Sequence, residues 1–232
     1  MASIKLVVFD IAGTIVEDHG DVVRAFAAAL EKHRIPFTHS ELEEWKGAAK
    51  REVIRHFVER QSSSAETQLV EAVYSDFRSL LEERYQQNVV PIAGADATFD
   101  WLRQRGIRIA TTSGFYREIV DLILDKAGWR GTFNANISSS DVSLGRPAPY
   151  MIFHAMEAAG VTSVAEVINV GDTPLDLQAG TNAGARGVVG VLTGFHKENR
   201  LRREPHTDLV ASVANLPELI EMQWSDGRPR PS

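Results

Sequence analysis

Cysteine is absent from this 232-residue chain, which excludes disulfide bonds, thiolate nucleophiles and zinc sites built on cysteine. Blocks of basic residues are also lacking, since none is longer than Arg202-Arg203. The chain has 25 lysine and arginine residues against 31 aspartate and glutamate residues, a net charge of -6. This balance argues against a nucleic-acid-binding surface and favours a small soluble ligand.

Long apolar runs are missing too. No stretch approaches the ~18 apolar residues that a membrane-spanning helix needs. The first apolar run begins within a few residues of Met1, which leaves no room for a signal peptide. We therefore expect a cytoplasmic protein that binds no membrane. The last eight residues, 225–232, contain two prolines, one glycine and nothing apolar, and are expected to form a flexible tail.

Short apolar runs alternate with helical patterns over much of the chain. Strands are predicted over Leu6–Phe9, Ile107–Ala110, Val167–Val170 and Val188–Leu192, and helices over Arg117–Lys126 and Pro149–Ala159. This alternation predicts an α/β fold of Rossmann-like type, with a parallel sheet flanked by helices. Because each run is almost entirely apolar, we expect both faces of the sheet to be covered.

Residues 21–88 break this alternation with helical patterns alone. Helices are predicted over Asp21–His33, Ser40–Arg60 with Gly47 in its middle, and Ala65–Gln87. Ser40 and Glu43 have the spacing of a capping box, which predicts a helix start at Ser40. We expect an all-helical cap at 19–90, inserted after the first strand, and a core domain made of 1–18 and 91–224.

Polar groups follow the predicted strands where each strand ends. Asp10 ends the first apolar run and is followed by Ala12-Gly13-Thr14, as expected for a nucleophile at the carboxyl edge of a parallel sheet. Ser113-Gly114 follows the second run. A hydroxyl and backbone N–H groups at the start of a helix are suited to holding a phosphate.

Charged groups complete the expected site. Asp172 and Asp176 bracket a turn after the third run, and Arg146 precedes a helix. A Mg²⁺ ion held by Asp10, Asp172 and a main-chain oxygen, assigned to Ala12, would screen repulsion between the nucleophile and an anionic phosphoryl group. Asp176 is interpreted as a further residue of the metal site, although the helix macrodipole alone would favour an acid there.

These four segments together resemble the haloacid dehalogenase superfamily. The patterns DxxGT, Ser-Gly, a basic residue before a helix, and GDxxxD match its four motifs in order and spacing. The resemblance covers the whole core and a helical cap in the first insertion position. It implies a Mg²⁺-dependent hydrolase in which Asp10 forms an aspartyl-phosphate, with a small phosphonate or phosphate as substrate, and it suggests a homodimer formed through the cap.

Two departures from the common pattern point to one group within that superfamily. Ala12 stands where most phosphatases carry a second aspartate as general acid and base, and Arg146 stands where a lysine is usual. Both resemble phosphonoacetaldehyde hydrolase and the phosphonatase-like hydrolases, in which a cap lysine forms a Schiff base with the substrate. Lys50 matches that lysine by its place in the cap and its spacing after Gly47. The resemblance therefore implies catalytic roles for Asp10, Lys50 and Arg146, and substrate-binding roles for Ala12, Gly13, Ser113, Gly114 and Arg146.

Helical spacing places Lys50 on an apolar face. Its offsets to Val53, Ile54, Phe57 and Val58 are three, four, seven and eight residues. An amine held in such surroundings loses hydration, which lowers the pKa of an ammonium and yields a neutral nucleophile. The alternative is a lysine with a buried stem and a solvated ammonium. The histidine and methionine that accompany the lysine of phosphonoacetaldehyde hydrolase are replaced by Val53 and Lys46.

The preferred prediction is hydrolysis of the carbon–phosphorus bond of a small 2-oxoalkylphosphonate through an imine on Lys50. A phosphomonoesterase is the alternative, disfavoured because Ala12 cannot protonate a leaving oxygen. A non-catalytic phosphate-ligand sensor is a second alternative. Phe115 and Tyr116 either face the substrate or only shield the site. Because cap and core each carry part of the site, we expect closure about hinges near 14–20 and 90–95.

Overall fold

The computed structural model describes residues 3–45, 47–60 and 67–224. Its centre is a six-stranded sheet in the order β3-β2-β1-β4-β5-β6. All five strand pairs are parallel, which confirms the parallel α/β sheet predicted from the sequence. The strands are β1 (Leu6–Phe9), β2 (Arg108–Ser113), β3 (Ala135–Ser138), β4 (Val167–Gly171), β5 (Gly187–Val191) and β6 (Asp208–Val210).

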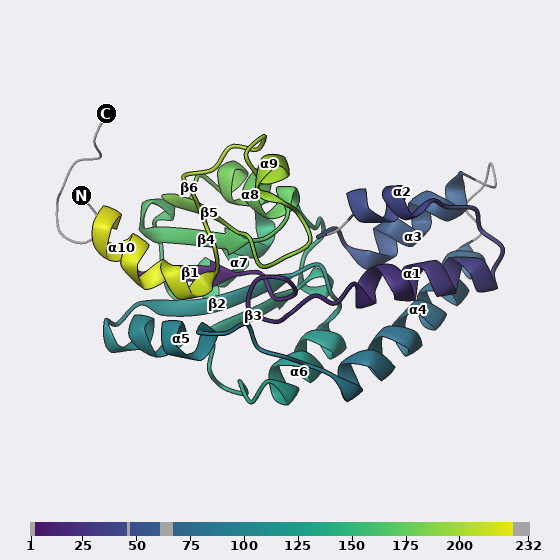
Figure 1. The fold of residues 1–232 in the computed structure, drawn as a ribbon, viewed down its shortest axis with the longest axis horizontal. Helices are drawn as coiled ribbons and strands as arrows, with labels where there is room; N and C mark the ends of the chain where they lie inside the picture. The colour runs from purple at the N-terminus through teal and green to yellow at the C-terminus, as the bar shows by residue number, and fades with distance from the viewer. Residues whose placement is uncertain (1–2, 46, 61–66, 225–232) are drawn as a thin grey trace.

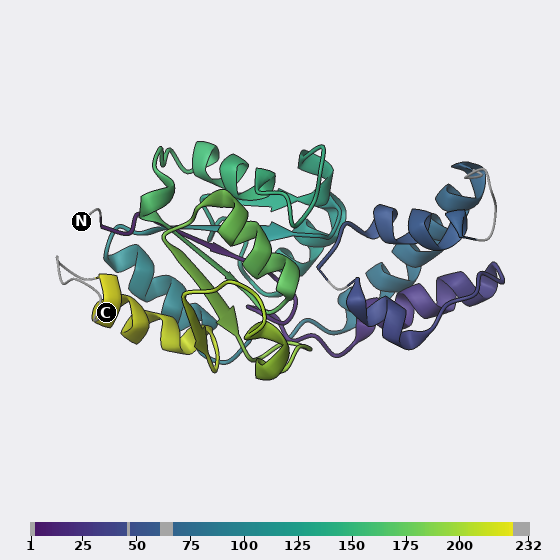
Figure 2. The same cartoon turned by 90° about the horizontal axis from the view of Figure 1, so that it is seen from above.

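Helices cover both faces of this sheet (Figure 2). They are α5 (Ala95–Gln104), α6 (Arg117–Lys126), α7 (Tyr150–Ala158), α8 (Pro174–Ala183), α9 (Glu198–Leu201) and α10 (Leu216–Trp224), with 3₁₀ turns at η1 (Ser139–Asp141), η2 (Val164–Glu166) and η3 (Val213–Asn215). Successive side chains of a strand point to opposite faces. Leu6 and Val8 therefore join the apolar cluster with α7 and α8, while Val7 and Phe9 join the one with α5 and α10. Every residue of β1 is buried.

The described residues between β1 and α5 form four further helices. They are α1 (Asp21–Lys32), α2 (His39–Glu44), α3 (Lys50–Glu59) and α4 (Thr67–Gln87), and Figure 1 shows them grouped beyond one end of the sheet. Helix α1 lies along α4, where the rings of Phe26 and Phe77 stack with centroids 4.3 Å apart. An all-helical insertion after the first strand is thus present. Its role as a cap and the boundaries 1–18, 19–90 and 91–224 stay predictions.

Two expectations about the inserted helices are wrong. The predicted helix Ser40–Arg60 is two helices, because Gly47 adopts a left-handed backbone with φ 86° between α2 and α3. The capping box is Thr38 with Glu41, not Ser40 with Glu43: the Thr38 hydroxyl accepts from Glu41 N at 3.2 Å and a Glu41 carboxylate oxygen accepts from Thr38 N at 2.8 Å.

Other differences concern strand number and chain ends. β3 and β6 were not predicted, and β2 begins one residue later and ends three residues later than expected. The predicted helix Ala65–Gln87 is described from Thr67 onward, since 65 and 66 lie outside the described residues, as does the predicted tail at 225–232. Over the described ranges, no helix is long and apolar enough to cross a bilayer.

The chain passes twice between the sheet and the inserted helices, and the two connections are hydrogen-bonded to each other. Glu17 N donates to Val90 O and Ile92 N donates to Ile15 O, both at 2.8 Å. Val16 also forms a bridge with Pro91. The predicted hinges near 14–20 and 90–95 lie on these segments, and movement about them stays a prediction.

Candidate active site

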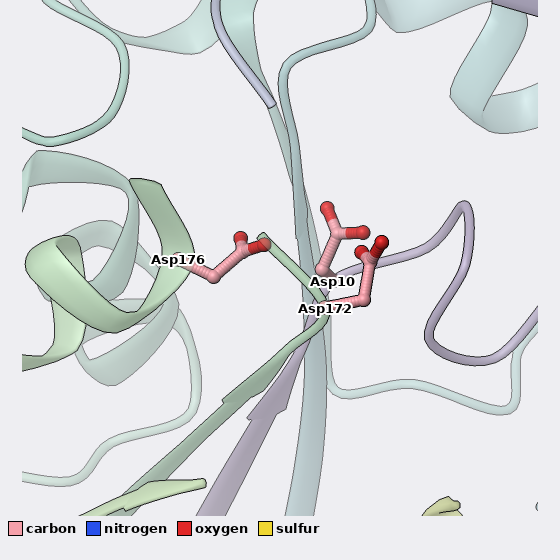
Figure 3. A group of neighbouring side chains, drawn as sticks. All are labelled: Asp10, Asp172 and Asp176. Carbon is pink, nitrogen blue, oxygen red and sulfur yellow. The ribbon is translucent and has the colours of Figure 1, made fainter. Parts of the chain in front are cut away.

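Three carboxylates meet at the carboxyl edge of the sheet. Asp10 directly follows β1, Asp172 directly follows β4, and Asp176 lies in the first turn of α8. Because β1 and β4 are adjacent parallel strands, their ends lie side by side, and Figure 3 shows Asp10 and Asp172 pointing the same way with Asp176 pointing toward them. One oxygen from each lies within 4.8 Å of the others, and all three residues are buried. The structure therefore brings the expected acidic residues together.

A single guanidinium is inserted among these carboxylates. Arg146 Nη1 lies 2.7 Å from an oxygen of Asp10 and 2.7 Å from an oxygen of Asp176. Its Nη2 donates to the Thr112 carbonyl at 2.8 Å and to the Thr112 hydroxyl at 2.9 Å. The arginine side chain is 3% exposed, so its orientation is fixed by buried partners.

Burial controls the protonation of Asp10. It raises the pKa of this carboxyl to about 6, with Arg146 opposing the shift and Asp176 reinforcing it. An isolated carboxylate would pay a large desolvation cost here, and the ion pair with Arg146 offsets part of it. Above about pH 6, Asp10 is therefore ionised, as a nucleophile must be.

Asp176 has two functions in this arrangement. One carboxylate oxygen accepts hydrogen bonds from Thr173 N at 3.0 Å and the Thr173 hydroxyl at 2.6 Å, which closes a capping box at the start of α8. The other oxygen meets Arg146. Helix capping thus explains the side chain's rotamer, and the second oxygen still belongs to the acidic cluster.

Gly13 allows the loop after β1 to approach Asp172. It has φ 88°, and a Cβ atom placed on it would lie 2.6 Å from a carboxylate oxygen of Asp172. A side chain at this position would therefore displace the Asp172 carboxylate. The Thr14 hydroxyl also lies 3.4 Å from the other Asp172 oxygen.

One pocket joins the sheet edge to the inserted helices. It is lined by Asp10, Ala12, Asp18, Val22, Gly47, Lys50, Ser113, Gly114, Phe115, Arg146, Asp172 and Thr173. Most residues predicted for the site belong to this lining. Gly13 and Asp176 do not, and instead contact Asp172 and Arg146. The Ser113 hydroxyl accepts a hydrogen bond from Phe115 N at 3.2 Å, which turns the chain at the end of β2.

Lys50 is the first residue of α3 and is only 5% exposed. The buried residues of this helix are Lys50, Val53, Ile54, Phe57 and Val58, as the helical spacing predicts. The Lys50 amine donates to the Ala48 carbonyl at 3.0 Å and lies 5.1 Å from the centre of the Phe115 ring. The alternative of a solvated ammonium is therefore wrong. The lysine lines the pocket that also contains Asp10.

The structure gives Phe115 and Tyr116 different positions relative to the pocket, a distinction that the sequence left open. Phe115 lines the pocket, whereas the Tyr116 hydroxyl donates to a carboxylate oxygen of Glu82 in α4 at 2.9 Å. Asp18, Thr112 and Thr173 are part of the site or support it, and none was predicted. Thr112 and Thr173 adjoin predicted site residues, which was a usable signal; Asp18 carried none. Lys46 lies outside the described residues.

Comparison with known proteins gives a consistent result. The sequence model of the haloacid dehalogenase-like hydrolases matches residues 4–184. A curated relative, the phosphonoacetaldehyde hydrolase of Hahella chejuensis (strain KCTC 2396), is 30% identical over 254 residues, covering 94% of this chain and 86% of the relative.

Two solved structures share the fold. The phosphonoacetaldehyde hydrolase-like protein from Oleispira antarctica has a TM-score of 0.85 at 24% identity, covering 95% of this chain and 92% of that one. A predicted phosphoglycolate phosphatase from Haemophilus somnus has a TM-score of 0.79 at 19% identity, covering 94% of this chain and 99% of that one.

Proposed function

We propose, from the premise that this chain belongs to the haloacid dehalogenase-like hydrolases, that it cleaves the carbon–phosphorus bond of a small 2-oxoalkylphosphonate. The observation that carries this proposal is a buried lysine, Lys50, in the same pocket as Asp10. The similarity to a curated phosphonoacetaldehyde hydrolase supports it. Membership in a hydrolase family also sets aside the non-catalytic sensor considered from the sequence.

Mg²⁺ fits the donor set of this site. Three buried carboxylates each offer an oxygen within 4.8 Å of the others, and carboxylate oxygens are the hard ligands that a divalent cation such as Mg²⁺ prefers. Asp10, Asp172 and the Ala12 carbonyl would hold the ion, with Asp176 beside them. When bound, Mg²⁺ supplies positive charge that reduces repulsion between the Asp10 carboxylate and the phosphonate oxygens.

Lys50 activates the leaving group in the proposed reaction. Its neutral amine attacks the substrate carbonyl carbon, and the carbonyl oxygen leaves as water together with the two amine protons, which gives a neutral imine. This imine takes one proton from solvent and becomes an iminium ion. A carboxylate oxygen of Asp10 then attacks phosphorus. The electron pair of the breaking carbon–phosphorus bond moves toward the iminium nitrogen, which leaves an enamine on Lys50 and a phosphoryl group on Asp10.

Two hydrolytic steps return the enzyme to its starting state. Water cleaves the aspartyl-phosphate and releases inorganic phosphate, and the enamine takes a proton on carbon. A second water then releases the carbonyl product from Lys50. Because the leaving carbon is stabilised through the imine, no acid is needed beside the nucleophile, which accounts for Ala12 at that position.

Arg146 and Ser113 bind the phosphonate end in this proposal. Arg146 lies 2.7 Å from Asp10, where its charge holds the nucleophile ionised and faces the transferring oxygens. The Ser113 hydroxyl and the backbone at Gly114 line the same pocket. Phe115 covers the Lys50 amine and limits the access of water to it.

A phosphomonoesterase is the second candidate, and one observation favours it. Asp18 lines the pocket, so a carboxyl group is present near the nucleophile although position 12 is alanine. Asp18 could then protonate a leaving oxygen. The Asp18→Asn variant distinguishes the two reactions, because phosphate-ester hydrolysis would require Asp18 and imine-dependent cleavage would not.

Borohydride trapping tests the proposal directly. Incubation with Mg²⁺, phosphonoacetaldehyde and borohydride should give a reduced adduct that mass spectrometry locates on Lys50. Lys50→Arg is the matched control, since it keeps the positive charge but cannot form the imine. Phosphate release from a panel of phosphonates should disappear in both Lys50→Arg and Lys50→Ala. Unchanged turnover of phosphate esters in Lys50→Ala, with no adduct in the wild type, would instead establish the phosphatase.

A further inference from the structure

The segment immediately before Lys50, residues 47–49, rests on three loops of the core. These loops follow β2 at Gly114, precede α7 at Gly145 and precede α8 at Thr173. We call these three contact points the seat. Each loop also carries a residue of the pocket or lies next to one, so the seat lies beside the pocket that Lys50 shares with Asp10.

Gly114 makes the tightest contact of the seat. A Cβ atom placed on it would lie 2.6 Å from the carbonyl oxygens of both Gly47 and Ala48. Gly114 is not among the glycines with positive φ, so a left-handed backbone is not the reason for glycine at this position. The glycine is therefore required here by the close approach of the segment 47–49 and not by the turn itself.

Gly145 makes a second contact of a different kind. A Cβ atom placed on it would lie 3.2 Å from the Ala49 Cβ, while the next nearest atom, Ala49 N, is 3.7 Å away. Its φ is also not positive. The crowding at this position therefore depends on one methyl group of the partner residue.

The third contact involves Gly47, a glycine of the inserted segment itself, which packs against Thr173 of the core. A Cβ atom placed on it would lie 2.7 Å from the Thr173 hydroxyl. Thr173 is the residue that donates to the Asp176 carboxylate at the start of α8. The segment thus contacts the same turn that orients part of the acidic cluster.

The seat is connected to Lys50 by one hydrogen bond. The Lys50 amine donates to the Ala48 carbonyl at 3.0 Å, and that carbonyl is one of the two oxygens packed against Gly114. We propose that the seat holds the Lys50 amine over the pocket, so that Gly114 and Gly145 are positioning residues for imine formation. This inference rests on the proposed function, because the amine has to reach a substrate whose phosphorus faces Asp10.

A double-mutant cycle at Gly145 and Ala49 tests the seat. Gly145→Ala should make the Lys50 amine react faster with a soluble amine-reactive reagent, and mass spectrometry would measure the labelling rate. The same variant should lower kcat for phosphonoacetaldehyde more than it raises KM. Ala49→Gly should behave like the wild type, since glycine is at least as good as alanine at the helix N-cap that Ala49 occupies. The double variant should recover wild-type labelling and turnover, because the nearest remaining contact is at 3.7 Å.

Gly114→Ala is a second test variant, one that Ala49→Gly should not rescue. Its clashes are with backbone oxygens, so Ala49→Gly should not restore it. A shift of the segment by about 1 Å should lower turnover about a hundredfold. Mg²⁺ affinity and the thermal unfolding midpoint should stay close to wild type in the Gly145→Ala variant, which separates misplacement of Lys50 from misfolding.

The outcomes separate this inference from the proposed function. Wild-type labelling of Lys50 in Gly145→Ala, or failure of Ala49→Gly to rescue that variant, would overturn the seat even if borohydride traps the wild type. Absence of an adduct in the wild type would overturn the proposed reaction, while the labelling experiment would still report whether the seat covers Lys50. If Gly114→Ala does not fold, the cycle at Gly145 and Ala49 decides.

Discussion

Arg146 is the residue on which the charge balance of the acidic cluster depends. One of its nitrogens lies 2.7 Å from both Asp10 and Asp176, and its side chain is 3% exposed. Lysine would place a single point charge there and could not also donate to the Thr112 carbonyl and hydroxyl. The planar guanidinium therefore does more than the usual lysine of this position could do, since it joins two carboxylates to the end of β2.

Arg146→Met should destabilise the metal-free protein at pH 7 by about 3–5 kcal/mol, because it leaves buried carboxylates without their cation. The loss should shrink as pH falls from 7 through about 6, the pKa of Asp10 in the folded wild type, and should level off below it, where Asp10 is protonated in both proteins. The direction of this pH dependence follows from proton binding. A buried carboxyl group with a raised pKa binds a proton more readily in the folded state, so low pH removes its unpaired negative charge. Urea unfolding at pH 5 and pH 7 measures both effects. A pH-independent difference below about 1 kcal/mol would contradict this account.

Residue-scale prediction from the sequence worked where a side chain follows a buried strand. The apolar run before Asp10 and the one before Asp172 end at the same sheet edge, so their meeting could be inferred without coordinates. Lys50 could be placed by its helical spacing. Asp18 could not, because its entry into the pocket depends on how the connection between β1 and α1 is packed.

At the scale of elements, Asp76 connects α1 with α4. Its carboxylate accepts from Lys32 Nζ at 2.8 Å and lies 2.7 Å from His33 Nε2, and the hydrogen bond from Lys32 lowers the pKa of Asp76. These contacts lie at the end of α1, where the helix leaves four carbonyls without partners. These contacts tie the end of α1 to α4.

Asp76→Asn should lower the free energy of unfolding by less than about 1 kcal/mol, since the group is near the surface. The pKa of Asp76 is lowered in the folded state, so its contribution is present above the unfolded value of 3.8 and is lost as pH falls through the folded value. The wild type and the variant should therefore differ at pH 6 and converge near pH 3. Asp121→Asn, at a side chain 62% exposed, is the control. A difference that grows in acid would refute the assignment.

Element prediction failed for physical reasons that can be named. β3 has the sequence ANIS, which lacks an apolar run, and becomes a strand only because β2 offers an unpaired edge. β6 has three residues, all half-buried, at the opposite edge. The break between α2 and α3 depends on the left-handed backbone of Gly47, whereas the apolar spacing on either side reads as one helix.

At the scale of the whole molecule, two connecting segments that are hydrogen-bonded to each other join the inserted helices to the sheet. If the predicted hinges bend, the pairing of Glu17 with Val90 and of Ile92 with Ile15 should make the two connections move together, which would favour rotation about one axis over independent bending. The structure has the inserted helices resting on the core at the seat. Homodimer formation and a cytoplasmic location stay predictions.

Mg²⁺ with a saturating phosphonate that cannot be cleaved should favour the closed arrangement. In the proposed binding mode such a ligand would contact Asp10 and Arg146 on one side and Lys50 on the other, because all three line one pocket, and a closed form should make all of these contacts. At 100 times its dissociation constant it should stabilise the fold by about 2.7 kcal/mol. For a protein of this length that is a rise of about 5–10 °C in the unfolding midpoint. If the contact at Gly114 limits closure, Gly114→Ala should show a smaller rise at the same ligand concentration and less compaction in solution scattering. Equal compaction of the variant and the wild type would mean that closure does not depend on the contact between Gly114 and the segment 47–49.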